Sequence, residues 1–164
     1  MRNGAKHDMS DGMTIGFLNR TPVRTFFLYP TITLVWEYVI RKGAINFHPL
    51  FLPLMLWGYL QYRFCGLYRL KHGGGGPGLE TPPERLVSTG PYAYTRNPMY
   101  LGHLAFLTGL TLTLQSGLAA LITVAVAIWF HRRVRGDESK LVERLGSPYV
   151  DYTRTVKRWI PGLF

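Results

Sequence analysis

Two long stretches without a charged side chain constrain what this chain can fold into. No Asp, Glu, Lys or Arg occurs in the 34 residues from Pro98 to His131 or in the 20 residues from Gly43 to Tyr62. A helix needs about 20 consecutive, mostly apolar residues to cross a bilayer. The sequence therefore predicts an integral membrane protein.

The strongly basic composition has two possible meanings. The chain has 19 Lys and Arg residues against 9 Asp and Glu, a formal net charge of +10, which suits a nucleic-acid-binding protein or a protein against anionic lipid. A nucleic-acid-binding domain would carry basic side chains on its helices and so interrupt each apolar stretch. Here the basic residues flank the uncharged stretches. We therefore expect membrane lipids, and no nucleic acid, as partners.

Four membrane-spanning helices are predicted. The first two cover residues 25–40 and 47–67, and they form a unit at residues 25–68 after a polar cytosolic N-terminus at residues 1–24. The stretch 98–131 is too long for one crossing. Because Gln115, Ser116 and Gly117 form a turn signal at its middle, we expect a hairpin with arms at residues 99–114 and 117–130. The expected fold is an all-α integral membrane bundle with a C-terminal cytosolic amphipathic helix, acting as a monomer.

The basic residues also predict an orientation. With four crossings, the side that holds both termini and the middle loop carries sixteen Lys and Arg residues, while the opposite side carries only Arg41 and Lys42. Cytoplasmic segments of membrane proteins carry such an excess of basic residues. We expect a multi-pass protein of the bacterial inner membrane with its N- and C-termini in the cytoplasm.

Two segments next to the hairpin carry most of the candidate chemistry. Residues 88–102 read STGPYAYTRNPMYLG, and residues 132–138 read RRVRGDE. The tyrosines and arginine of the first segment could form an aromatic belt at the membrane interface. They could equally hold a polar cofactor with a cationic centre and a carboxylate, because exposed backbone N–H groups at a helix start bind anions and aromatic rings bind cations.

The face that begins at the acidic pair of the second segment continues along a helix. Its members recur at spacings of three and four residues, as one face of a helix requires; they are Glu138, Leu141, Leu145, Tyr149 and Tyr152. Gly146 and Pro148 interrupt this helix, which can restart after a kink. We expect this face to pack on the 88–102 loop.

Other residues are weaker candidates. Cys65 is the only cysteine, and no Cys/His cluster has zinc-ligand spacing, so we expect no metal site. Gly73, Gly75 and Gly78 satisfy a G-x-G-x-x-G pattern by chance, because no strand is expected before them. Glu37 is expected to reach toward the far membrane surface, and His103 to make a hydrogen bond between helices.

Together, residues 82–102 and 137–161 resemble the isoprenylcysteine carboxyl methyltransferase family and its bacterial relatives, which are integral-membrane methyltransferases that use S-adenosylmethionine (SAM). The matching sequences are PPERLVSTGPYAYTRNPMYLG and DESKLVERLGSPYVDYTRTVKRWIP. With the hairpin between them they cover about the C-terminal half of the chain. Eukaryotic members read Arg-His-Pro where this chain has Arg96-Asn97-Pro98, and Glu-Glu where it has Asp137-Glu138.

The resemblance implies a catalytic part at residues 69–164, divided into a cofactor loop at 69–97, the hairpin at 98–131 and a C-terminal helix and tail at 132–164. It implies three catalytic residues, Arg132, Asp137 and Glu138. It also implies a set of SAM-binding residues, which are Gly90, Pro91, Tyr92, Arg96, Asn97, Pro98, Tyr100, Leu101, Tyr149 and Tyr152.

The expected function is SAM-dependent methylation of a lipophilic acceptor that enters from the bilayer. The protein needs no nucleophile of its own, because SAM carries an activated methyl group and the enzyme has only to align the acceptor. A carboxylate acceptor would need an arginine such as Arg96 or Arg132 to place it, and an amine would need a base such as Glu138. Two alternatives remain, an NADPH-dependent membrane reductase with sterol-reductase-like architecture and a non-enzymatic membrane scaffold.

Overall fold

The structure, a computed structural model, describes residues 20–160 of the chain, so most of the polar N-terminus predicted at residues 1–24 lies outside the described residues. Within residues 20–160 the elements are all helical, which confirms the predicted all-α class. In chain order they are α2 (Thr21–Val23), η1 (Arg24–Leu28), α3 (Tyr29–Ile40), η2 (Pro49–Phe51), α4 (Leu52–Gly73), η3 (Gly90–Ala93), α5 (Pro98–Leu114), α6 (Gly117–Leu145) and α7 (Ser147–Thr155).

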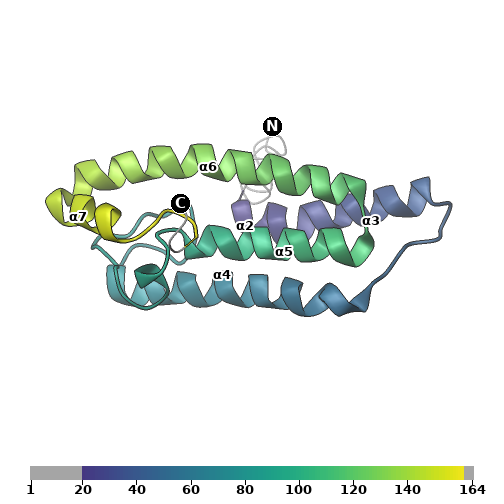
Figure 1. Cartoon of the computed structure of the whole chain (residues 1–164), viewed down its shortest axis with the longest axis horizontal. Helices are drawn as coiled ribbons and strands as arrows, with labels where there is room; N and C mark the ends of the chain where they lie inside the picture. The colour runs from purple at the N-terminus through teal and green to yellow at the C-terminus, as the bar shows by residue number, and fades with distance from the viewer. Residues whose placement is uncertain (1–19, 161–164) are drawn as a thin grey trace, which may run out of the picture.

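The long helices form an elongated bundle in which successive helices run in opposite directions (Figure 1). One end holds the α4–α5 loop and α7, and the other holds the α3–α4 connection and the α5–α6 turn. Helices α4 and α5 approach backbone to backbone, because a Cβ atom built on Gly58 would lie only 2.4 Å from the backbone nitrogen of Phe106. Glycine is the residue that permits this separation.

The first helix is continuous from α2 through η1 to α3 and begins at Thr21, one turn before the predicted start. Its η1 segment is a wide π-helical turn in which the N–H of Tyr29 donates to the carbonyl of Arg24, five residues back. Pro30 follows directly and has no N–H to donate. A π-turn is a usual way for a helix to absorb such an interruption.

The predicted hairpin turn is confirmed. Helix α5 ends at Leu114, Gln115 adopts a left-handed conformation with φ +45°, and the Oγ of Ser116 accepts a hydrogen bond of 3.1 Å from the N–H of Ala119. Ser116 is therefore the N-cap of α6. Beyond the predicted arm, α6 continues without a break to Leu145. Because α6 runs antiparallel to α5, its charged C-terminal half projects past the N-terminal end of α5 at Pro98.

The amphipathic face predicted for the tail is divided between two helices. Glu138 lies on α6, which ends where Gly146 adopts φ +66°, and α7 restarts with Pro148 in its first turn. Tyr149 and Tyr152 on α7 are buried, as is Glu138. The predicted kink is thus present at Gly146.

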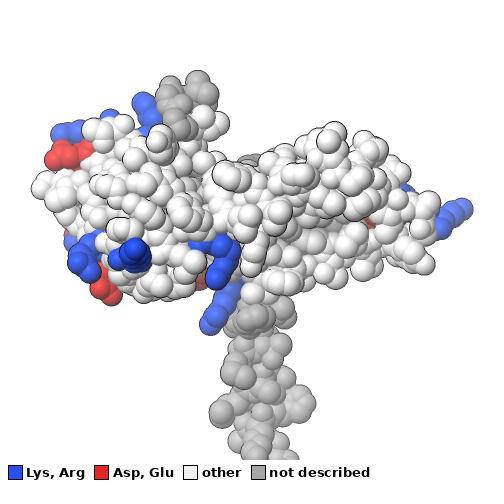
Figure 2. Space-filling view, turned by 90° about the horizontal axis from the view of Figure 1, so that it is seen from below, with Lys and Arg blue, Asp and Glu red and all other residues white. Residues whose placement is uncertain are grey.

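Only α6 among the described helices is both long and apolar enough to cross a membrane by length and composition. The predicted bundle of four crossings is not confirmed by this measure: α3 has 12 residues and α5 has 17, while α4 carries Arg63, Arg69 and Lys71 in its second half. The surface nevertheless divides by charge. Figure 2 shows charged side chains gathered toward the α7 end and at the opposite tip, with a broad uncharged region between them.

Two polar residues within the bundle differ from their predictions. Glu37 does not reach outward: it is buried, accepts a 2.6 Å hydrogen bond from the Oγ of Ser116 and pairs with Arg41 at 2.5 Å. Within residues 20–160, His103 makes no interhelical hydrogen bond, because both its ring nitrogens are buried and have no partner there. Its ring instead stacks on Phe26, with 4.8 Å between the ring centroids.

Candidate functional site

A cavity of about 380 Å³ lies at the end of the bundle that carries the α4–α5 loop. Its walls come from that loop, the start of α5, the projecting half of α6 and α7. This volume is within the range of about 300–1,000 Å³ that small-molecule sites occupy. The cavity therefore brings together segments that are up to 80 residues apart in the sequence, and the predicted packing of α6 and α7 against the 88–102 loop is present.

Most of the residues predicted for the site line this cavity. They are Tyr92, Arg96, Asn97, Tyr100, Asp137, Glu138, Tyr149 and Tyr152. Five predicted residues lie outside the lining, namely Gly90, Pro91, Pro98, Leu101 and Arg132.

The residues outside the lining have other places in the fold. Gly90 and Pro91 begin the short helix η3, which positions Tyr92, and Pro98 is the first residue of α5. Arg132 is exposed on α6, and its neighbour Arg133 lines the cavity instead. Successive residues of a helix point about 100° apart, so the choice between these two arginines depends on how α6 is rotated.

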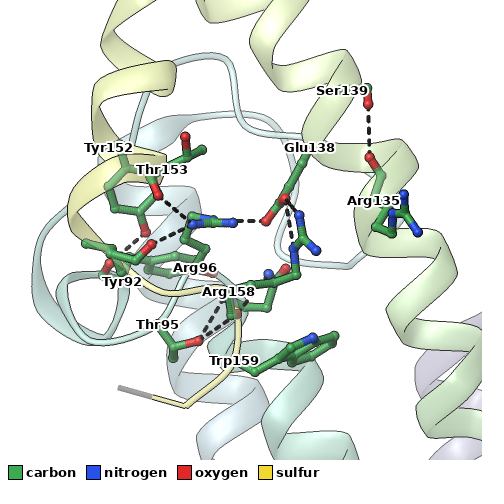
Figure 3. Close-up of polar contacts among 12 residues, drawn as sticks. Tyr92, Thr95, Arg96, Arg135, Glu138, Ser139, Tyr152, Thr153, Arg158 and Trp159 are labelled. Atoms are coloured by element: carbon green, nitrogen blue, oxygen red, sulfur yellow. Dashed lines mark hydrogen bonds and ion pairs between the residues drawn. The ribbon is translucent and has the colours of Figure 1, made fainter. Parts of the chain in front are cut away.

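Arg96 is the centre of the polar network around the cavity (Figure 3). Its Nε donates to Oε1 of Glu138 at 2.9 Å, and its Nη1 donates to the carbonyls of Thr153 at 3.0 Å and Val156 at 2.5 Å. Its side chain is only 8% exposed. Arg96 thus ties the loop before α5 to α6 and to the end of α7.

Glu138 is held by two arginines. Its Oε2 accepts from both Nε and Nη2 of Arg158, at 3.0 and 2.6 Å, while its Oε1 accepts from Arg96. Burial favours a higher pKa for the Glu138 carboxyl, but the hydrogen bonds from Arg158 and Arg96 outweigh burial and hold that pKa below its usual range. Glu138 is therefore an ionised carboxylate with both oxygens engaged.

The tyrosines around the cavity hold its walls together through their hydroxyl groups. Tyr152 donates to the carbonyl of Tyr92 at 2.6 Å, and Tyr92 donates to the carbonyl of Cys65 at 3.3 Å. Burial raises the pKa of Tyr92 and of Tyr152, so both remain neutral donors at physiological pH. Tyr100 donates to Oδ2 of Asp137 at 3.0 Å, which links the start of α5 to α6.

A segment after α7, residues 156–160, folds back across the loop before α5. The carbonyl of Lys157 accepts from the N–H of Arg96 at 3.0 Å, and the carbonyl of Arg158 accepts from Thr95 Oγ1 and Asn97 Nδ2 at 3.0 and 3.2 Å. Figure 3 shows Arg158 and Trp159 on this segment beside Glu138 and Thr95. This C-terminal strap covers one side of the site.

Six charged residues of the site were not predicted. Five line the cavity, namely Arg69, Glu80, Arg133, Lys140 and Arg144, and Arg158 pairs with Glu138. Arg133 could have been found from its spacing, because it lies four residues before Asp137 and pairs with it at 3.5 Å. No helical spacing marks Arg69, Glu80 or Arg158, since their partners lie at least seven residues away in the sequence.

Residues 75–145 match the sequence profile of the phospholipid methyltransferase family. The chain is also similar to protein-S-isoprenylcysteine O-methyltransferases: 36% identical over 78 residues to that of Saccharomyces cerevisiae, 31% over 80 residues to that of Dictyostelium discoideum, and 32% over 78 residues to that of Schizosaccharomyces pombe. These alignments cover 46–48% of this chain and 32–33% of each relative.

The chain thus spans about a third of the length of the curated relatives it matches. The matched segment contains nearly all of the α4–α5 loop, with its Gly-rich start at residues 74–78, and all of α5 and α6, which form three of the walls of the cavity. The resemblance seen in the sequence is therefore confirmed: residues 75–145 match the profile of the phospholipid methyltransferase family, and the chain is similar over 78–80 residues to isoprenylcysteine O-methyltransferases.

Proposed function

We propose that this chain is a SAM-dependent membrane methyltransferase that methylates a lipophilic carboxylate or amine. The observation that carries the proposal is that the segment shared with methyltransferases builds most of the walls of one cavity with side chains of both charges and several tyrosines. That cavity lies at the charged end of the bundle, beside the uncharged surface.

The cavity lining suits SAM by its chemistry. SAM has a sulfonium and an ammonium group, which are cations, and one carboxylate. Asp137 and Glu80 supply carboxylates for the cations, and the tyrosine rings supply π faces. Arginines of the lining supply donors for the carboxylate. A volume of about 380 Å³ is sufficient for a ligand of this size.

When bound, SAM would supply a methyl group already activated on its sulfonium. The protein's own residues would bind and orient the reactants and exclude water. Because both oxygens of Glu138 are engaged by arginines, we assign Glu138 to positioning Arg96 and Arg158 rather than to accepting a proton. Asp137 makes weaker contacts, at 3.0 and 3.5 Å, and is the carboxylate better placed to face a cation.

The uncharged surface supports entry of the acceptor from the bilayer. Large apolar side chains are exposed on α3, α4 and α6, among them Val39, Trp57 and Leu121. Contiguous apolar surface of this kind is typical of membrane contact. We propose that the four long helices lie in the membrane, with the α7 end in the cytoplasm, since most basic residues lie at that end.

A second cavity, of about 360 Å³, supports a separate place for the acceptor. Its lining includes Tyr62, Arg63 and Pro77, and it shares Glu80 with the first cavity. Arg63 has no ion-pair partner within residues 20–160. Two adjoining cavities with one common residue are what a two-substrate transfer needs.

Isothermal calorimetry of the detergent-solubilised protein tests the proposal with SAM, S-adenosylhomocysteine and NADPH as ligands. We expect SAM and S-adenosylhomocysteine to compete for one site, and Asp137→Asn to weaken both. The matched control is Glu143→Gln, which neutralises an exposed carboxylate of the same helix. Binding of NADPH alone would favour the reductase, and binding of none of the three would favour the scaffold.

The acceptor is identified by incubating the purified protein with lipid extracts and methyl-labelled SAM, followed by mass spectrometry. We expect label in an amphiphile that carries a carboxylate or an amine. Label found only in water-soluble molecules would contradict entry from the bilayer.

A further inference from the structure

We propose that Arg69 binds the carboxylate of the cofactor's amino-acid moiety, an inference that rests on the proposed function. Arg69 lies one turn before the end of α4 and lines the first cavity. It is only 9% exposed. It lies outside residues 75–145, the segment that matches the family profile.

Only one nitrogen of the Arg69 guanidinium is engaged by the described part of the protein. Nη2 donates to the carbonyls of Gly76, Gly78 and Thr81, which anchors the Gly-rich loop over the end of α4. Nε is buried without a partner, and Nη1 makes no hydrogen bond to residues 20–160. Nη1 of Arg69 is therefore the guanidinium nitrogen that has no acceptor among residues 20–160 and is not buried out of reach of a ligand.

Arg69 also has no carboxylate partner in the described part of the chain. The other buried or half-buried arginines of the lining have acidic partners, since Arg96 pairs with Glu138 at 2.9 Å and Arg133 with Asp137 at 3.5 Å. Arg69 pairs with no Asp or Glu of residues 20–160. Buried charges in proteins are almost always paired. A buried guanidinium at a cavity wall, with Nη1 unengaged by residues 20–160, indicates an anionic ligand.

The chemistry of the cavity's expected ligand selects the anion. A guanidinium N–H donates a strong, charge-assisted hydrogen bond to a carboxylate, and SAM and S-adenosylhomocysteine each carry a single carboxylate. An anionic group of the acceptor would instead meet Arg63 in the second cavity, whose lining does not include Arg69. The first cavity therefore pairs Arg69 with the cofactor.

The test compares two ligands that differ in the amino-acid moiety. Calorimetry measures the Kd of S-adenosylhomocysteine and of 5′-methylthioadenosine, which lacks the carboxylate, for the wild-type protein, Arg69→Gln and Arg85→Gln. Arg85 is the matched control, an exposed arginine of the α4–α5 loop that does not line the cavity. We expect Arg69→Gln to weaken S-adenosylhomocysteine at least tenfold and 5′-methylthioadenosine less than threefold, and Arg85→Gln to change neither.

Equal weakening of both ligands would mean that Arg69 only anchors the loop, and unchanged binding of S-adenosylhomocysteine would overturn the proposal as well. If Arg69→Gln does not fold, Arg69→Met replaces it, with the same ligand-selective loss expected because methionine carries neither the charge nor the N–H donors.

A second experiment distinguishes failure of the proposed function from failure of the anion site at Arg69. If the wild-type protein binds neither nucleoside, the methyltransferase proposal fails, and Arg69 is then tested with inorganic sulfate against chloride at matched ionic strength. A larger rise of the Tm in sulfate for the wild-type protein than for Arg69→Gln would support an anion site at Arg69. Equal rises would overturn it.

Discussion

Replacing Glu138 by Gln tests the network that joins α6, the loop before α5 and the C-terminal strap. The substitution removes the charge that compensates two arginines, of which Arg96 is 8% exposed and Arg158 is 30% exposed at the side chain. Removing one partner of a buried ion pair costs about 3–5 kcal/mol. Solvent screens the more exposed arginine, and the Gln carbonyl retains one acceptor, so we expect a loss of about 3 kcal/mol.

Thermal unfolding in detergent measures this loss. For a chain of this size, 1 kcal/mol corresponds to roughly 2–4 °C in Tm, so Glu138→Gln is expected to lower the Tm by about 6–12 °C. Glu143→Gln, at an exposed position on the same helix, is the control and should change the Tm by no more than about 2 °C. A Tm for Glu138→Gln equal to that of the control would refute the argument that the network stabilises the site.

The difference in Tm between the wild-type protein and Glu138→Gln is expected to depend on pH. The pKa of the Glu138 carboxyl is lowered in the folded protein. The ionised carboxylate therefore contributes its full share to the free energy of unfolding above the unfolded-state pKa of about 4.5, and this share is lost as the pH falls through the folded-state pKa. The difference in Tm between the wild-type protein and Glu138→Gln should therefore be constant from pH 7 to pH 5 and should shrink below about pH 4.5. A difference that grows on acidification would contradict the assignment of an ionised carboxylate.

Four further substitutions separate packing from binding. Gly58→Ala should destabilise the protein by roughly 2 kcal/mol or more, because the new Cβ would lie 2.4 Å from a backbone nitrogen of α5; Gly136→Ala has open space and should stabilise by about 1 kcal/mol, as Tm measurements of both will check. Tyr152→Phe removes the 2.6 Å hydrogen bond to the carbonyl of Tyr92 and should cost about 1–2 kcal/mol and weaken S-adenosylhomocysteine; unchanged Tm and Kd would contradict a role in joining α7 to the loop. Glu37→Gln, at the opposite end of the bundle, should lower the Tm but leave the Kd for S-adenosylhomocysteine unchanged, and a change in Kd by calorimetry would show that the two ends are coupled.

Much of the fold follows from local sequence. The hairpin turn at Gln115 and Ser116 and the kink at Gly146 are set by residues that favour a left-handed conformation or cap a helix. The lengths of the helices around them were harder to predict, because α6 continues through Arg132 where charge alone suggested a boundary. Arginine is a good helix former, so a change from apolar to basic residues does not end a helix.

The candidate site was predicted only where its residues share a short motif. Tyr92, Arg96 and Asn97 lie in one loop, and Asp137 and Glu138 lie in one helical turn, so their proximity is local. The family resemblance assigned both groups to one site, and packing brings them to one cavity.

By itself, the sequence determined the helical class, the turns and the two polar segments, because these depend on interactions between residues close together along the chain. Tertiary structure alone decided that Arg133 rather than Arg132 faces the cavity, that Arg158 pairs with Glu138, and that Arg69 is buried with no acidic partner among residues 20–160. The reason is geometric. The rotation of a helix about its axis and the path of a returning strap depend on how all the elements pack, and one residue of shift turns a side chain by about 100°.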